Sequence, residues 1–468
     1  MGLIEEASRT LVDKIADQLL LRLMRDPYVE NVWEIISTTM KVRPRDLMEI
    51  VLRAEKGKPL GRPFGTVYHF SPWQDVLFNP VHLVRLPTED KNNVETKVTL
   101  GPRAQRPLEL AIPIIISGMS YGGAISKQAR IALAKAATAA GTATNTGEGA
   151  YLPEERELAA KYIYQYHRGQ WPHGNKKEFY TMADMVEIQL GQGAQASAPQ
   201  TTKADKIDEE FRHIFGLEEG EDAVIASRLS GLESGEDLKH LVARLKEETG
   251  GVPISYKFAA SHYLEEEIEL AVAAGVDVIV IDGAEAGTHA GQPLLADAFG
   301  LPTMHALVRA VDYLEEKGVR DKVSIIASGG LLSPEHFLKA MALGADAVYI
   351  GTAAVMAMIH TQMVESSPFE PPTQLVLYSG RLKDELDTDL AAKSLTNYLN
   401  SCVAEMVLGA VALGKNALAE IDRHDLCALT PEVAAITGVE LAYRRKEAAL
   451  LPLAEQAANV GAEIPTAH

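Results

Sequence analysis

From Ile112 onward, short apolar runs that contain many β-branched residues alternate with segments of helical periodicity. This alternation is typical of βαβ units with right-handed crossovers. It predicts eight strands, at Ile112–Ser117, Thr142–Asn145, Met185–Leu190, Ala223–Ser227, Pro253–Phe258, Asp277–Ile281, Val323–Ala327 and Asp346–Ile350. Eight units in series predict an α/β fold with a closed (β/α)₈ TIM barrel over residues 111–360. A doubly wound open sheet is the alternative, although no GxGxxG motif follows the first strand.

Residues that start and stop helices fit these crossovers. Ser126 can cap a helix that ends at Gly141, and Ser333-Pro334 can open a helix that ends at Gly344. Both helices are therefore predicted to separate consecutive strands.

Three further segments flank the predicted barrel. Residues 1–60 carry apolar residues at helical spacing from Leu11 to Leu23, and again from Val32 to Leu52, which predicts an N-terminal extension of packing helices. Residues 61–110 are irregular, with many prolines and aromatics, and are expected to wrap the barrel as an arm. Residues 361–468 lack strand alternation, so they predict a helical C-terminal region that caps the barrel or pairs subunits. Asn397–Ala412 is expected to be a buried helix within it.

Charge and composition narrow the range of partners and compartments. The formal net charge is -19 without a Lys/Arg cluster, which argues against nucleic acid or a membrane surface as partner. Cys402 and Cys427 are the two cysteines, too few for a cysteine-ligated cluster or a disulfide framework, and they suit a reducing compartment. Glu5 and Glu6 stand where a signal peptide would have positive charge, and no apolar run is long enough to span a membrane. We therefore expect a cytoplasmic protein without a metal site.

Two consecutive predicted strands end in glycine. Ser328-Gly329-Gly330 closes one and Gly351-Thr352 closes the next. Without a Cβ atom, backbone N–H groups at such strand ends can approach a phosphate closely. The pattern favours FMN as ligand, and a sugar-phosphate enzyme without flavin is the alternative.

The ends of the earlier strands also carry residues suited to a flavin site. Gly118, Met119 and Ser120 offer glycine-flanked backbone to a flat ring, or serve only as a turn. Asn145 and Glu148 follow the second strand, where Glu148 is a candidate proton carrier or amine ligand. The amide of Gln189 can both donate to and accept from the pyrimidine edge of a flavin.

Strand alternation places Ser255 and Lys257 on one face, so Lys257 is predicted to point into the barrel. A reduced flavin would supply the negative charge that a buried ammonium needs, and an ion pair with a carboxylate is the alternative. A glycine-containing loop follows the next strand and is expected to cover the site. The loop residues assigned to the site are Asp282, Gly283, Gly287, Thr288 and His289, the last as acid or base near neutral pH.

Taken in order, these strand ends resemble the FMN-binding synthase domain of the glutamate synthase family, over about residues 60–440. The matching stretches are Ile116–Gly122, Asn145–Gly149, Gln192–Ala194, Ile281–Glu285 and Ser328–Gly330. The tail Asp425–Thr430 is similar to that of single-domain relatives, including the flavin subunit of N-methylglutamate synthase. The resemblance implies hydride delivery from reduced FMN to the imine of 2-oxoglutarate and an amine. Lys257 would then sit beside the flavin and Glu148 would handle the amine.

The sequence departs from that family in several places. Nothing before residue 60 reads as a glutaminase domain, and residues 353–368 contain no cysteine for an iron–sulfur cluster. After Ala194 the family usually has a lysine and several glycines, whereas this chain has Gln195, which weakens the case for a dicarboxylic 2-oxo acid. Lys203 or Arg228 are candidate substitutes for the lost cation. Ala286 and His289 stand where relatives commonly have glycine.

Three hypotheses follow from the sequence. The first is a glutamate synthase-type reductive amination, with a partner subunit supplying electrons or amine. The second is an FMN oxidoreductase for a less acidic substrate, with His289 as proton carrier. The third is a non-catalytic flavin-binding subunit of a larger complex. The apolar terminal helices favour a homo-oligomer.

Overall fold

The computed structural model describes residues 2–27, 30–31, 36, 39–289 and 291–444, and the chain divides into two units at Gly61. The first unit contains α1 (Gly2–Arg25) and α3 (Pro44–Lys56). Leu11, Ile15 and Leu19 are exposed on α1, and α3 has no buried residue. Residues 32–35 and 37–38 of the second predicted apolar set lie outside the described residues.

The second unit is built on an eight-stranded parallel sheet, which confirms the (β/α)₈ barrel. The sheet order is β4-β13-β12-β11-β10-β7-β6-β5. Its strands are β4 (Ile114–Ile116), β5 (Thr144–Asn145), β6 (Tyr162–Tyr166), β7 (Met185–Gln189), β10 (Ile254–Ala259), β11 (Val278–Asp282), β12 (Ser324–Ser328) and β13 (Ala347–Ile350). Two bonds link β4 to the residues directly before β5: Ile116 N–H donates to the Ala143 carbonyl at 3.3 Å, and Thr142 Oγ1 donates to the Ile114 carbonyl at 2.7 Å. The barrel is thereby closed.

One of the eight predicted strands is wrong and one barrel strand was missed. The predicted strand Ala223–Ser227 contributes β9 (Ala223–Ile225), which pairs antiparallel with β8 (Gln200–Thr202) outside the barrel. The missing strand is β6, which pairs with β5 and β7. The crossover before β6 contains only the short α5 (Pro153–Leu158), whereas residues 190–253 hold an extra apolar run. The expectation of regular spacing therefore selected the wrong segment.

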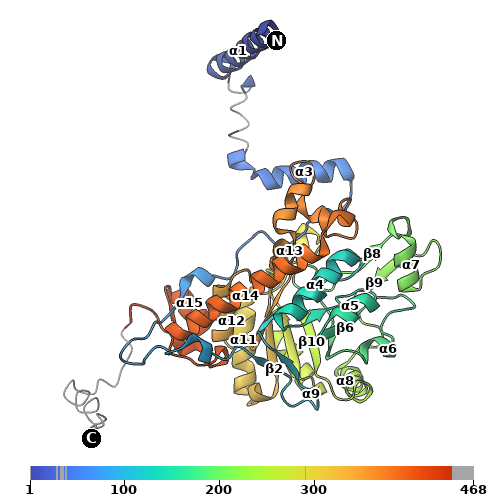
Figure 1. Cartoon of the computed structure of the whole chain (residues 1–468), viewed down its shortest axis with the longest axis vertical. Helices are drawn as coiled ribbons and strands as arrows, with labels where there is room; N and C mark the ends of the chain where they lie inside the picture. Colours follow the sequence, from blue (N-terminus) through green and yellow to red (C-terminus); the bar gives the residue numbers. More distant parts are fainter. Residues whose placement is uncertain (1, 28–29, 32–35, 37–38, 290, 445–468) are drawn as a thin grey trace. The chain divides into compact units, whose positions relative to one another are not determined.

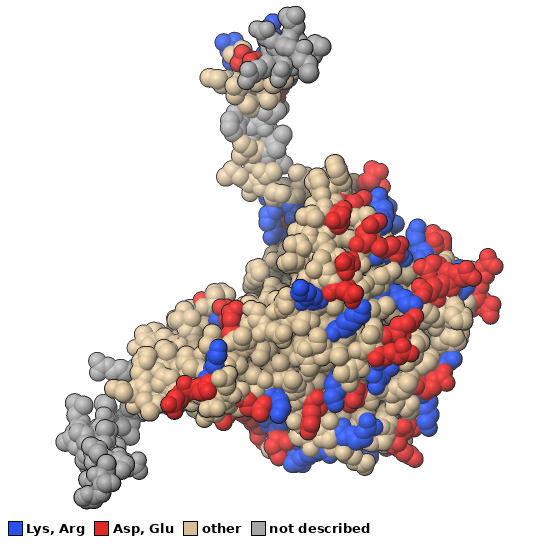
Figure 2. Space-filling view, viewed as in Figure 1, with Lys and Arg blue, Asp and Glu red and all other residues tan. Residues whose placement is uncertain are grey.

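Helices surround the strands (Figure 1). They are α4 (Lys127–Ala140), α6 (Lys177–Tyr180), α7 (Glu209–Phe215), α8 (Gly235–Thr249), α9 (Leu264–Ala274), α10 (Pro293–Ala298), α11 (Thr303–Glu316), α12 (Pro334–Ala342) and α13 (Thr352–Ile359). Ser126 caps α4 by accepting from Ala129 N–H at 3.2 Å, and Gly141 ends it at φ 71°, as predicted. α12 begins at Pro334 as predicted but ends two residues before Gly344. Figure 2 shows acidic and basic side chains interspersed over the face of the barrel in view.

A hairpin fills the N-terminal end of the barrel. It is formed by β2 (Val98–Leu100) and β3 (Leu108–Leu110). Leu100, Leu108 and Leu110 are buried with residues that start the barrel strands, among them Met185 and Val278. This end is therefore packed with apolar side chains, which leaves the C-terminal strand ends as the open face.

The chain after the barrel is mainly helical. It contains α14 (Thr388–Ala412), the strand β14 (Leu426–Ala428) and α15 (Pro431–Thr437). α14 includes the predicted buried helix and buries Leu395, Leu399 and Met406. β14 pairs antiparallel with β1 (Val76–Phe78), so the segment before the barrel and the tail join on one side. Among the described helices, none combines the length and apolar character needed to cross a membrane.

Arg130 on α4 ties together the loops that follow β4 and β5. Its guanidinium donates to the Met119 carbonyl at 2.6 Å and to the Asn145 carbonyl at 2.7 Å, and it forms a buried ion pair with Glu155. Because both charges are removed from water, loss of either partner would leave an uncompensated buried charge and lower the free energy of unfolding.

Arg130→Met is expected to lower the free energy of unfolding by about 3–5 kcal/mol, because Glu155 would remain buried without its cation. Arg130→Met with Glu155→Leu should be less destabilised, since no uncompensated charge is left. Denaturant unfolding followed by circular dichroism measures both. As a control, Arg103→Met breaks an exposed pair with Asp321 and should cost at most about 1 kcal/mol. Equal losses for the two single variants would contradict the expectation.

Candidate active site at the C-terminal ends of the barrel strands

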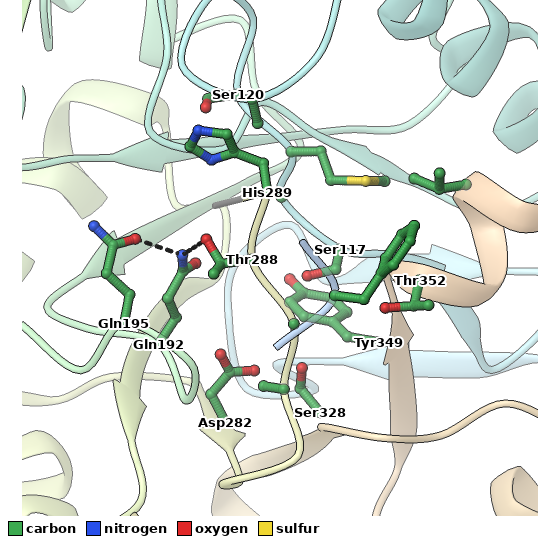
Figure 3. Close-up of a pocket in the computed structure, with 18 of the residues that line it drawn as sticks. Ser117, Ser120, Gln192, Gln195, Asp282, Thr288, His289, Ser328, Tyr349 and Thr352 are labelled. Atoms are coloured by element: carbon green, nitrogen blue, oxygen red, sulfur yellow. Dashed lines mark hydrogen bonds between the residues drawn. The ribbon is translucent and has the colours of Figure 1, made fainter. Parts of the chain in front are cut away.

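A pocket opens where the barrel strands end (Figure 3). It is lined by side chains and backbone from the loops after β4, β5, β7, β11, β12 and β13. Of the residues predicted for the site, the following line it: Gly118, Met119, Ser120, Glu148, Lys257, Asp282, Gly287, Thr288, His289, Ser328, Gly329, Gly330, Gly351 and Thr352. The barrel thus brings together residues that are more than two hundred positions apart in sequence.

The glycines after β12 and β13 form one edge of the pocket. Gly330 has φ 67°, in the left-handed region that favours glycine. Gly351 has φ -117°, and a Cβ atom built on it would point into open space. Gly351 also immediately precedes α13, whose first N–H groups have no acceptor within the helix. Open space above bare backbone at a helix N-terminus suits an anionic group such as a phosphate.

Lys257 lies at the floor of the pocket, as strand alternation predicted. Its side chain is 2% exposed, and Nζ is 4.0 Å from Asp282 Oδ2. The same Nζ lies 5.7 Å from the centre of the Tyr349 ring. The ion pair considered from the sequence is therefore present, at a distance longer than a hydrogen bond.

Gln189 and Asp282 carry buried polar atoms that lack partners. Neither the amide nitrogen nor the amide oxygen of Gln189 has a hydrogen-bond partner among the described residues, and the same holds for Oδ1 of Asp282. Gln189 does not line the pocket, but it pairs in register with Lys257 on the neighbouring strand. Unpaired buried amides are costly, so a bound group that both donates and accepts would fit here.

Glu148 is held by an arginine that the sequence analysis did not single out. Arg168 Nε donates to Glu148 Oε1 at 2.9 Å, and Arg168 Nη2 donates to Oε2 at 2.7 Å. Both side chains are buried. The carboxylate is therefore fixed in place and charge-compensated. Arg168 follows β6, which the sequence analysis did not predict as a strand. Residues at the end of β6 were therefore not considered as site residues.

Asn145 and Gly283 are the other two predicted site residues that do not line the pocket. Asn145 donates from Nδ2 to Glu187 Oε1 at 2.9 Å, and Glu187 also accepts from Gln165 at 2.8 Å and from the Tyr349 hydroxyl at 2.7 Å. This buried network supports the floor of the pocket. Gly283 packs against Thr303, where a Cβ would collide.

His289 lies at the wall of the pocket beside Gln200. Burial lowers the pKa of the His289 imidazole to about 4. Its Nε2 is 3.1 Å from the amide nitrogen of Gln200, which can donate to the neutral ring. The imidazole is therefore uncharged near pH 7, where one ring nitrogen carries a hydrogen and the other can accept a hydrogen bond.

Several residues of the site were not assigned from the sequence. Arg168 holds Glu148 from outside the pocket lining, and the lining itself adds Gln165, Gln192, Gln195, Gln200 and Tyr349. Gln192 and Gln195 lie in the loop that was recognised as different from the related family. The sequence analysis did not predict that their amides would line the pocket.

A closed parallel barrel with a glycine-edged anion cradle and a lysine at its floor defines the class of (β/α)₈ barrel enzymes with an active site at the strand ends. The family model described as a conserved region in glutamate synthase matches residues 75–416. The chain belongs to the glutamate synthase family.

Two relatives named as glutamate synthases or similar to them agree with this assignment. A glutamate synthase large subunit-like protein of Rhizobium meliloti is 34% identical over 399 residues, covering 81% of this chain and 90% of that protein. An archaeal glutamate synthase of Archaeoglobus fulgidus is 35% identical over 332 residues, covering 71% of this chain and 64% of its own length. A solved structure of (S)-mandelate dehydrogenase is 14% identical with a TM-score of 0.47, covering 76% of this chain and 88% of that one.

Acidification should destabilise the protein partly through His167, which is 1% exposed next to Arg168. Burial lowers the pKa of His167 to about 4. Between the ordinary pKa of about 6.5 and that value the unfolded chain binds the extra proton, so stability is lost as pH falls through this range. The loss should reach about 3 kcal/mol by pH 4. His167→Gln should flatten the curve of unfolding free energy against pH, while His240→Gln, at an exposed site, should not.

Proposed function

We propose that the chain is an FMN-dependent oxidoreductase that carries out hydride transfer of the glutamate synthase type. One observation carries the proposal. Lys257 and the unpartnered amide of Gln189 lie side by side in the sheet, below a glycine edge that leaves room for a phosphate. A flavin mononucleotide has one polar ring edge and one phosphate, which match these two features.

The residues present fit this cofactor. Backbone N–H groups at Gly330, Gly351 and Thr352 would hold the phosphate. The Gln189 amide would donate to and accept from the pyrimidine edge of the ring, and the Lys257 ammonium would face the same edge. When bound, FMN supplies the hydride acceptor and donor of the reaction.

The first candidate reaction is reductive amination of a 2-oxo acid, in the sense of 2-oxoglutarate to glutamate or an N-alkyl glutamate. Relatives named glutamate synthase support it. In this reaction the role of Glu148 would be to accept hydrogen bonds from the amine, because Arg168 holds its carboxylate in a fixed orientation. Electrons or amine would come from a partner subunit.

The second candidate is oxidation or reduction of a less acidic substrate. A specific observation favours it: among the described residues that line the pocket, Lys257 is the one lysine or arginine, and it already faces Asp282. Two carboxylates of a substrate would find no further cation there.

Gly351→Val tests the cofactor assignment. The φ of -117° lies outside the left-handed region and a Cβ atom built on Gly351 meets no atom within 4 Å, so the fold should be kept while the side chain fills the phosphate space. We expect the wild-type protein to show flavin absorption and the variant to bind added FMN at least about 10-fold more weakly. Thermal unfolding of both proteins serves as the control for folding. Unchanged FMN affinity in a folded variant would contradict the assignment.

The reaction itself is tested by stopped-flow reoxidation of the reduced enzyme. Mixing with 2-oxoglutarate and ammonium or methylamine should restore the oxidised flavin spectrum if the first candidate holds. Lys257→Met should retain flavin but slow this step by about 100-fold or more, because the charge at the ring edge is lost. The second candidate would be selected if 2-oxoglutarate failed to reoxidise the flavin at every amine concentration while a less acidic acceptor succeeded.

A further inference from the structure

One wall of the pocket is made of amide side chains. We call this surface the amide wall. It consists of Gln192, Gln195, Gln200 and the neutral imidazole of His289. Gln192 and Gln195 lie across the pocket from Ser117, Tyr349 and Thr352 (Figure 3). The amide wall is thus separate from the glycine edge that suits a phosphate.

Hydrogen bonds fix the amide wall in place. Gln192 Nε2 donates to Gln195 Oε1 at 2.9 Å and lies 3.4 Å from Thr288 Oγ1. The turn that carries both glutamines is closed by Ala196 N–H donating to the Gln192 carbonyl at 2.6 Å. Ala196 takes φ 51°, a conformation that an alanine adopts only when its surroundings require it. The glutamines are therefore held in position before any ligand arrives.

The amide wall keeps unused hydrogen-bonding capacity of both kinds. Gln195 uses both ends of its amide, since Nε2 also donates to the Ala198 carbonyl at 3.2 Å. The carbonyl oxygens of Gln192 and Gln200 have no partner among the described residues, and neither does Nδ1 of His289. With Nε2 accepting from Gln200, Nδ1 carries the proton. The amide wall therefore offers two acceptors and one donor.

Charge near the amide wall does not favour an anion. The carboxylates of Glu148 and Asp282 in the pocket lining are paired with Arg168 and Lys257, so these two cations are already engaged. The candidates to replace the missing lysine do not reach it either: Lys203 pairs with Asp222 at 2.7 Å, Arg228 is exposed, and neither lines the pocket. A substrate carboxylate here would meet two carbonyl oxygens without a compensating cation.

We infer that the amide wall selects a small substrate whose group distal to the reacting carbon is uncharged and both donates and accepts hydrogen bonds. A carboxamide is the closest match, because its N–H groups suit the two carbonyl oxygens and its oxygen suits the His289 N–H. This inference rests on the proposed function for the identity of the reacting centre. It turns the loss of a cation at Gln195 into a change of specificity.

The test compares two ligands that differ only in the distal group, 2-oxoglutarate and its ω-amide 2-oxoglutaramate. Isothermal titration calorimetry on the full chain should show the amide binding at least about 10-fold more tightly. Gln195→Lys should reduce or remove this preference by tightening 2-oxoglutarate binding about 10-fold. Gln200→Lys places the same charge elsewhere on the amide wall, so the result does not depend on one variant folding.

Gln105→Lys is the matched control, because it adds the same charge at an exposed position between β2 and β3 and should leave both affinities unchanged. Equal or tighter binding of the dicarboxylate by the wild type would overturn the inference, as would failure of the amide to bind at millimolar concentration. The proposed function fails on a different readout, since a protein that cannot bind FMN lacks flavin absorption whichever ligand it prefers.

Discussion

A lysine ammonium buried inside the barrel is the constraint around which the site is arranged. Lys257 is almost fully removed from water, so its charge must be balanced by groups on other strands. Asp282 on β11 supplies the opposite charge, and the Tyr349 ring on β13 faces the ammonium. The Tyr349 hydroxyl in turn donates to Glu187 on β7. Four strands are thus coupled through polar side chains, which fixes the floor of the pocket.

Most of the fold could be predicted because the periodicity of buried parallel strands is local. Seven of the eight predicted strands lie in the barrel, and helix starts and ends such as Ser126 and Gly141 follow from short-range hydrogen bonds. β6 was missed because the number and spacing of crossovers are not local properties. Tyr162–Tyr166 has suitable β-forming residues, but only pairing with β5 and β7 distinguishes it from the apolar run at Ala223.

The candidate site likewise has features that local sequence predicts and features that it does not. Glycines at strand ends and the inward lysine could be predicted, because each depends on its own backbone conformation or strand face. The partners of the charged groups could not. Glu148 looks like a free carboxylate in the sequence, and only the fold brings Arg168 to it. Asn145 sits at a strand end like its neighbours, yet its amide is used by Glu187 below the pocket. Which strand-end residues face the pocket therefore depends on contacts between distant segments.

The leucine-filled hairpin at the N-terminal end of the barrel limits the directions from which a ligand can reach the pocket. Leu100, Leu108 and Leu110 fill the N-terminal end of the barrel, so among the described residues the entrance to the pocket lies at the C-terminal strand ends. Anything that reaches the pocket floor must come and go by that entrance. A reductant and an oxidant that both need contact with the floor would take turns, because the first to arrive obstructs the second. Because the reductant and the oxidant would use the same entrance, the order in which they bind and leave would be part of the kinetic mechanism.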